Sequence, residues 1–228
     1  MIVAIHQPNF LPWLGFFHKL LLSDVFVLFD NVQFSRGKGF TNRVNIKMAK
    51  GVSWLTVPVA HKGLCLPIKD VKIAQLENWK EKHLRTLWSS YKNAIFFDDF
   101  YNELTKIYEG NHAYLADFNT DLILLIAKFL DADTLILKAS ELIEDGGRGP
   151  ELIAKIVKAV GADKYLAGGG NGQKRYQEEI ANKDFEVLFQ QFKHPEYKQL
   201  WGEFQANLSV IDLIFNHGKN SKEILLKY

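Results

Sequence analysis

Near the start of the chain, Ile2-Val3-Ala4-Ile5-His6-Gln7-Pro8-Asn9 is followed at some distance by Val25-Phe26-Val27-Leu28-Phe29-Asp30-Asn31. Each stretch is a short apolar run closed by polar residues, which is typical of a strand buried on both faces of a parallel sheet. Between them, residues 14–22 predict a helix, with Pro12 near its first turn, where a missing N–H costs little. Strand, helix and strand within about thirty residues predict a βαβ unit with a right-handed crossover.

The rest of the chain extends this unit into a larger α/β pattern. Alternating residues at 43–47 and 54–59 around a turn predict a β-hairpin, and the period of residues 76–130 is helical. Further strands are predicted at 134–137, 164–167 and 185–189, and further helices at 151–160 and 209–215. We therefore expect an α/β fold with a parallel, Rossmann-like (nucleotidyltransferase-like) sheet core, a β-hairpin and a helical insertion. The expected parts are an N-terminal half (1–75), the insertion (76–130) and a C-terminal half (131–228) that completes the same sheet.

The composition excludes several classes of protein. The 228 residues carry 28 Lys and Arg against 26 Asp and Glu, a net charge of +2, which argues against a nucleic-acid-binding protein. A single cysteine, Cys65, excludes an internal disulfide framework and is expected to be a small buried residue. No basic segment typical of a signal peptide and no apolar run of about 18 residues is present. We expect a cytoplasmic protein without membrane insertion, and its oligomeric state stays open.

The first strand–helix loop holds the densest group of polar and aromatic residues. We single out His6, Gln7, Asn9, Trp13 and Gly15. In an open parallel sheet, ligands bind in the crevice outside the carboxyl ends of the strands. A helix N-terminus behind the loop attracts phosphate or carboxylate groups. The alternative is that His6 and Asn9 merely cap the loop and the helix.

A second group follows the second predicted strand, and its members are Asp30, Asn31, Gln33, Asn42 and Arg43, with Arg36 and Lys38 between them. Its side chains should open on the same crevice because the two strands are neighbours. The guanidinium of Arg43 matches phosphate oxygens in pairs. Asp30 is expected to orient a sugar hydroxyl or amine, to act as a base, or to bind Mg²⁺. For Arg36 and Lys38 a solvated loop explains the sequence equally well.

Two later groups complete the candidates. Gly168 and Gly169 follow a predicted strand, with Lys174 in the same glycine-rich loop, where backbone N–H groups can hold an anion. Near the end of the chain we single out Tyr197, Gln199, Asp212 and Asn216, of which the last two share a helix face with Ser209, a plausible N-cap. Tight polar packing explains this last group as well. The remaining histidines show no paired spacing, so no metal site is expected.

The run from His6 to Lys19 resembles the opening signature of the WbqC-like protein family. Similar segments recur along nearly the whole chain, at 30–34, 42–47, 56–59, 165–168 and 209–218. The resemblance implies a role in O-antigen and other surface-polysaccharide biosynthesis. It indicates the pathway in which the protein acts more closely than the reaction that it catalyses. The first loop is also similar, at the level of the fold, to nucleotidyltransferases and pantothenate synthetase, which bind ATP. Those enzymes carry His-x-Gly-His where this chain has Trp13-Leu14-Gly15-Phe16, so the glycine is kept and both histidines are absent.

These observations together predict an enzyme that acts on a nucleotide-activated amino sugar by ATP-dependent acyl or aminoacyl ligation. His6 or Asp30 would be the base, the other singled-out residues would bind substrate, and ATP with Mg²⁺ would be a cosubstrate without any tightly bound cofactor. Nucleotides and nucleotide sugars are the expected partners. One alternative is a non-catalytic sugar-nucleotide-binding or scaffold protein, which exposure of Trp13, Phe16 and Phe17 would favour. Another is a glycosyltransferase, although the adjacent pair Asp98-Asp99 lies in the helical segment.

Overall fold

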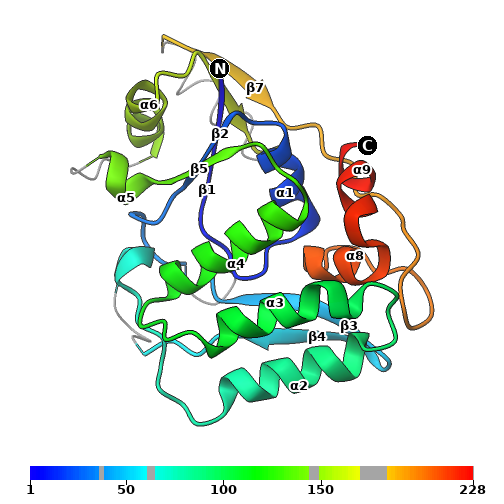
Figure 1. Cartoon of the computed structure of the whole chain (residues 1–228). Helices are drawn as coiled ribbons and strands as arrows, with labels where there is room; N and C mark the ends of the chain where they lie inside the picture. Colours follow the sequence, from blue (N-terminus) through cyan, green and yellow to red (C-terminus); the bar gives the residue numbers. More distant parts are fainter. Residues whose placement is uncertain (36–38, 61–64, 144–148, 170–183, 228) are drawn as a thin grey trace.

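The structure, a computed structural model, describes residues 1–35, 39–60, 65–143, 149–169 and 184–227 (Figure 1). Its strands are β1 (Ile2–His6), β2 (Val25–Leu28), β3 (Arg43–Met48), β4 (Gly51–Thr56), β5 (Leu135–Lys138), β6 (Lys164–Ala167) and β7 (Glu186–Phe189). Its α-helices are α1 (Leu14–Leu21), α2 (Trp79–Tyr91), α3 (Phe97–Glu109), α4 (Leu115–Phe129), α5 (Ala139–Leu142), α6 (Gly149–Ala159), α8 (Val210–His217) and α9 (Ser221–Leu226). Two 3₁₀ turns, η1 (Ile68–Asp70) and η2 (Gly218–Asn220), connect some of them.

The core is a five-stranded sheet in the order β5-β2-β1-β6-β7, and each neighbouring pair is parallel. The predicted α/β fold, with a parallel sheet, a hairpin and a helical segment, is confirmed. β1 lies in the middle because its residues are apolar on both faces, so the strand can be covered from both sides. Within the sheet, β2 lies next to β1 on one side, and β6, which forms later in the chain, lies next to β1 on the other.

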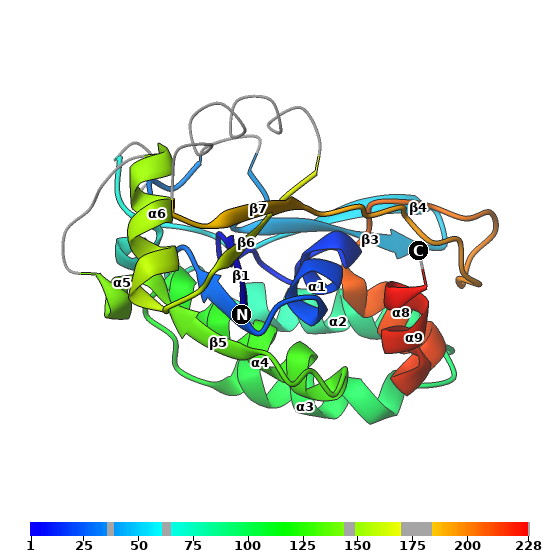
Figure 2. The ribbon, with the colours of Figure 1, turned by 90° about the horizontal axis from the view of Figure 1, so that it is seen from above.

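The alternation of side chains along the central strands divides the interior into two cores. Val3 and Ile5 of β1 pack with apolar residues of α5 and α6, whereas Ala4 packs in the larger core with α1 and α4. The same period of two places Val25 and Val27 of β2 in the first core. Figure 1 accordingly shows the strands between α6 on one side and α1 on the other, and Figure 2 shows α6 and the α8–α9 pair at opposite ends of the molecule.

The hairpin β3–β4 forms a separate two-stranded antiparallel sheet. Its second strand begins at Gly51, three residues before the predicted start at Trp54, and ends at Thr56 rather than Val59. The difference has a local cause, because Met48 pairs with Gly51 and leaves a two-residue turn, and Gly51 has a φ of 113°, which glycine adopts without strain. The larger core continues from the hairpin through α2, α3 and α4 to α8.

Two further findings bear on the expectations from the sequence. Cys65 is exposed, so the prediction that it is buried was wrong. Within the described ranges, no helix combines the length and the apolar character that crossing a membrane requires.

Candidate functional site

A cavity of about 680 Å³ opens at the carboxyl ends of β1, β6 and β7. The described residues that line it come from the end of β1, the β1–α1 loop, α1 and the segments after β6 and β7. They are His6, Trp13, Gly15, Lys19, Gly168, Gly169, Gln190, Gln191, Phe192 and Lys193. The cavity lies where the strand order reverses, since the chain leaves β1 toward β2 on one side and forms β6 on the other. Ligands of open parallel sheets bind at such a topological switch point.

Lys19 places a buried amino group in the wall of this cavity, and a bound anion would favour its charged form. Its side chain is 3% exposed, and its Nζ donates a hydrogen bond of 2.9 Å to the carbonyl oxygen of Ile5. Burial lowers the pKa of the Lys19 ammonium from 10.5 to about 7. Among the described residues, no carboxylate lies within ion-pair distance of Nζ. A buried cation without a counter-ion is unfavourable unless an anion joins it.

His6, at the end of β1, presents an uncharged imidazole. Its Nδ1 donates to the carbonyl oxygen of Gln7 at 3.0 Å, and its ring packs edge-on against Phe16 with the ring centroids 4.9 Å apart. Burial, and secondly the charge of Lys19, lower the pKa of His6 to about 3. Because the proton of the neutral ring is on Nδ1, the other nitrogen, Nε2, is available as a hydrogen-bond acceptor.

Two glycines allow close approaches around the cavity. A Cβ atom at Gly15 would lie 2.2 Å from the indole ring of Trp13, so the ring can fold over the start of α1 only because this residue is glycine. Trp13 in turn contacts Phe192 edge-on, with the centroids 5.4 Å apart, which gives the cavity an aromatic wall. A Cβ atom at Gly169 would lie 2.7 Å from the carbonyl oxygen of Gln190, so glycine there lets the segments after β6 and β7 approach each other.

Gln190 is a site residue that the sequence analysis missed, and His18 of α1 is its hydrogen-bond partner. Gln190 is 8% exposed, and its Nε2 donates to the carbonyl oxygen of Gly15 at 2.8 Å and to His18 Nδ1 at 2.9 Å. Burial lowers the pKa of His18, which keeps its Nδ1 free to accept. A signal for Gln190 existed, because it directly follows a predicted strand. Lys19 carried the weaker signal of a cation inside an apolar helix.

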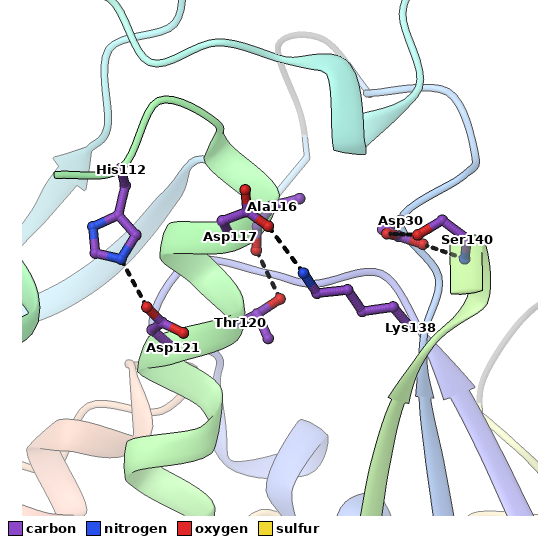
Figure 3. A network of polar contacts seen from close by, with 8 residues as sticks. All are labelled: Asp30, His112, Ala116, Asp117, Thr120, Asp121, Lys138 and Ser140. Atoms are coloured by element: carbon purple, nitrogen blue, oxygen red, sulfur yellow. Dashed lines mark hydrogen bonds and ion pairs between the residues drawn. The ribbon is translucent and has the colours of Figure 1, made fainter. Parts of the chain in front are cut away.

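The residues after β2 lie elsewhere. Asp30 is 3% exposed, and its carboxylate accepts hydrogen bonds from the backbone N–H of Ser140 at 2.9 Å and from Ser140 Oγ at 2.5 Å (Figure 3). Asp30 therefore holds the start of the short helix α5. Asn31 is partly buried, and its Oδ1 has no partner among the described residues, while Gln33 is exposed. These three residues are absent from the described lining of the cavity.

The predicted residues of the hairpin take part in local contacts. Asn42 Nδ2 donates to the carbonyl oxygen of Val57 at 3.0 Å. The guanidinium carbon of Arg43 lies 4.6 Å from the ring centroid of Trp54. Neither residue lines the described part of the cavity.

The C-terminal group forms a buried polar network away from the cavity. Asp212 is fully buried, and its two carboxylate oxygens accept hydrogen bonds from the hydroxyls of Tyr91 and Tyr197, each at 2.9 Å. Asn216 Nδ2 donates to the backbone oxygen of Asp212 at 2.7 Å, and Gln199 Oε1 accepts from Lys47 Nζ at 3.0 Å. These contacts match the packing interpretation of the group.

The structure thus brings together His6, Trp13, Gly15, Gly168 and Gly169. Gln7 is partly buried and Asn9 is 5% exposed in the same loop, outside the described lining. The predicted N-cap is confirmed, because Ser209 Oγ accepts a hydrogen bond from the backbone N–H of Ile211. Lys174, Arg36 and Lys38 fall outside the described residues.

Comparisons with known proteins agree with the resemblance noted in the sequence. The model of the WbqC-like protein family matches residues 7–224. The chain is also 29% identical over 227 residues to a protein of Mycobacterium tuberculosis, the uncharacterised Rv1507c, and the match covers 98% of this chain and 96% of the relative.

Proposed function

Since the chain belongs to the WbqC-like protein family, we propose that it is an enzyme of bacterial surface-polysaccharide biosynthesis. Its substrate in this proposal is a nucleotide-activated amino sugar, bound in the cavity at the ends of β1 and β6. ATP with Mg²⁺ is the cosubstrate of an acyl or aminoacyl ligation.

The observation that carries the proposal is the buried Lys19 ammonium in the cavity wall, which has no carboxylate partner among the described residues. A phosphate group would supply the missing negative charge. Lys193 and the N-terminus of α1, close to Gly15, line the same cavity and add favourable charge for an anion. The indole of Trp13 offers an apolar face for a base or sugar ring. Mg²⁺ would arrive bound to the phosphates, as it commonly does in enzymes that use ATP.

The proposed reaction has two steps. A carboxylate attacks the α-phosphorus of ATP, pyrophosphate leaves, and an acyl-adenylate remains. The amine of the sugar then attacks the acyl carbon, AMP leaves, the amide forms, and one proton is released from the nitrogen. Of the two predicted bases, His6 is the better supported, because its Nε2 is free to accept and it lines the cavity. The carboxylate of Asp30 is engaged with Ser140. A bound polyphosphate would raise the pKa of His6 by placing negative charge beside it.

The scaffold alternative receives less support. It required exposed aromatic side chains on the first helix, whereas Phe16 is 1% exposed and Phe17 is fully buried. Trp13 remains partly exposed, but it faces the cavity. The glycosyltransferase alternative is also weak, because Asp98 and Asp99 are exposed in the first turn of α3 rather than at a strand end.

A thermal-shift panel tests the proposal. The full chain is mixed with Mg·ATP, inorganic pyrophosphate, UDP-glucosamine or dTDP-linked amino sugars. A ligand at 100 times its Kd adds about 2.7 kcal/mol of stability, which should raise Tm by roughly 5–11 °C at this chain length. We expect stabilisation by ATP and a further gain with an amino-sugar nucleotide, followed by pyrophosphate release when a carboxylic acid is added. No stabilisation by any of these compounds would refute the proposal.

A further inference from the structure

We infer that Gln190 determines the specificity of the cavity, by accepting a hydrogen bond from the amino group of the bound sugar. The inference rests on the proposed function and narrows it, because it says which atom of the protein distinguishes an amino sugar from other phosphate-bearing ligands.

The hydrogen bonds of Gln190 fix which way its amide faces. The carbonyl oxygen of Gly15 can only accept, so the atom 2.8 Å from it must be the amide nitrogen. The same nitrogen donates to His18 Nδ1 at 2.9 Å. The two hydrogen bonds together use both hydrogens of the Gln190 amide nitrogen. Reversing the amide would place its oxygen against the Gly15 carbonyl oxygen. The side chain is therefore held in one orientation by two partners on α1.

This orientation leaves the amide oxygen for a ligand. Oε1 accepts no hydrogen bond from the described residues, and it is not one of the fully enclosed atoms that lack a partner. It therefore remains accessible to solvent, and Gln190 is one of the residues that line the cavity. An accessible acceptor on an otherwise buried and immobilised amide suits an N–H or O–H donor of a ligand.

The other acceptor in the cavity favours an amine over a hydroxyl. His6 Nε2 is also an acceptor without a donor from the described part of the chain, because Nδ1 holds the proton of the neutral ring. Two acceptors therefore line a cavity whose cations, Lys19 and Lys193, suit phosphate. An amino group carries two or three N–H donors and so matches two acceptors, whereas a hydroxyl donates only once.

Isothermal titration calorimetry with three compounds tests the inference. Inorganic pyrophosphate reports on the phosphate site alone, and UDP-glucosamine and UDP-glucose differ in one amino group. We expect the wild-type protein to bind UDP-glucosamine more tightly than UDP-glucose. In the variant Gln190→Met, the affinity for UDP-glucosamine should fall by about 10- to 100-fold, the range for a hydrogen bond to a charged group. The affinity for pyrophosphate should stay within about threefold of the wild-type value, because uncoupled sites respond independently.

Variants of His18, a positioning residue, provide the control for a merely structural effect. The Oδ1 atom of asparagine can take the place of Nδ1, so His18→Asn should retain the preference for UDP-glucosamine, whereas His18→Leu should lose it. Equal losses of affinity for pyrophosphate and UDP-glucosamine in Gln190→Met would overturn the inference. So would an unchanged preference in that variant. If the wild-type protein binds pyrophosphate but shows no preference for the amino sugar, only this inference fails. If it binds none of the three compounds, the proposed function fails.

Discussion

Replacing Lys19 with methionine is expected to stabilise the free protein and to remove its affinity for phosphate. The ammonium is 3% exposed, and its pKa falls from 10.5 to about 7. Each unit of pKa corresponds to about 1.36 kcal/mol, so at pH 7 the lowered pKa of Lys19 destabilises the folded state by about 4 kcal/mol relative to a lysine with an ordinary pKa. Methionine loses the hydrogen bond to Ile5, a loss of about 1–2 kcal/mol. The net gain of about 2–3 kcal/mol should raise Tm by roughly 4–12 °C.

The pH dependence identifies the cause of this gain. Between pH 7 and 10.5 the unfolded chain holds the Lys19 proton more often than the folded protein does. The free energy of unfolding of the wild type should therefore gain a contribution that rises with pH across this window, and Lys19→Met should lack it. The destabilisation linked to this proton should fall from about 4 kcal/mol at pH 7 to about 2 kcal/mol at pH 9, because the folded protein must release a proton that the unfolded chain keeps. The stability advantage of the variant should shrink accordingly.

Urea unfolding at pH 7 and pH 9 measures the stabilities, and calorimetry with pyrophosphate measures the binding. Lys158→Met is the matched control, because Lys158 is exposed on α6 and should change neither quantity. A Lys19→Met protein that is less stable than the wild type at pH 7, or that binds pyrophosphate equally well, would refute this reasoning.

Three further predictions concern the surroundings of the cavity and the polar network. Gly169→Ala should weaken ligand binding and lower Tm, because the new methyl group would lie 2.7 Å from the carbonyl oxygen of Gln190; calorimetry and a thermal melt check both effects. Asp30→Ala should lower the free energy of unfolding by about 1–3 kcal/mol, because it removes two hydrogen bonds to Ser140, and a large loss of pyrophosphate affinity would instead show a direct role in binding. Tyr197→Phe should lower it by about 1.5–3 kcal/mol, measured by urea unfolding, because it removes a donor to a buried carboxylate, while the Kd for pyrophosphate stays unchanged.

The sheet could be predicted from the sequence because its strands are continuous apolar runs with clear ends. The same feature placed His6 and Gly168 at the cavity, since residues that directly follow neighbouring parallel strands share an edge of the sheet. Asp30 follows a strand too, but its closest partner, Ser140, is 110 residues away, and no local pattern indicates that pair. The sequence therefore gave no sign that the Asp30 carboxylate is hydrogen-bonded to Ser140.

The residues that were missed depend on tertiary packing. Lys19 lies on the eight-residue helix α1, which contacts both the sheet and α9. The helical period alone therefore does not show which side chains of α1 are buried. A lysine there becomes buried only when those elements pack around it. Gln190 directly follows a predicted strand, but its role follows from the positions of Gly15 and His18, more than 170 residues earlier.

The way the first loop is held has a consequence for the synthesis of the protein. Ser209 Oγ donates a hydrogen bond to the carbonyl oxygen of Leu11 at 2.7 Å. The backbone N–H of Val210 donates to the carbonyl oxygen of Pro12 at 2.9 Å. The loop is thus held by residues about 200 positions later in the sequence, and the loop-closure entropy of such contacts must be paid before they add stability. On the ribosome, the first loop cannot be held in this position until almost the entire chain has been made. A nascent or truncated chain that ends before α8 should therefore fail to bind phosphate ligands, however well its earlier strands have paired.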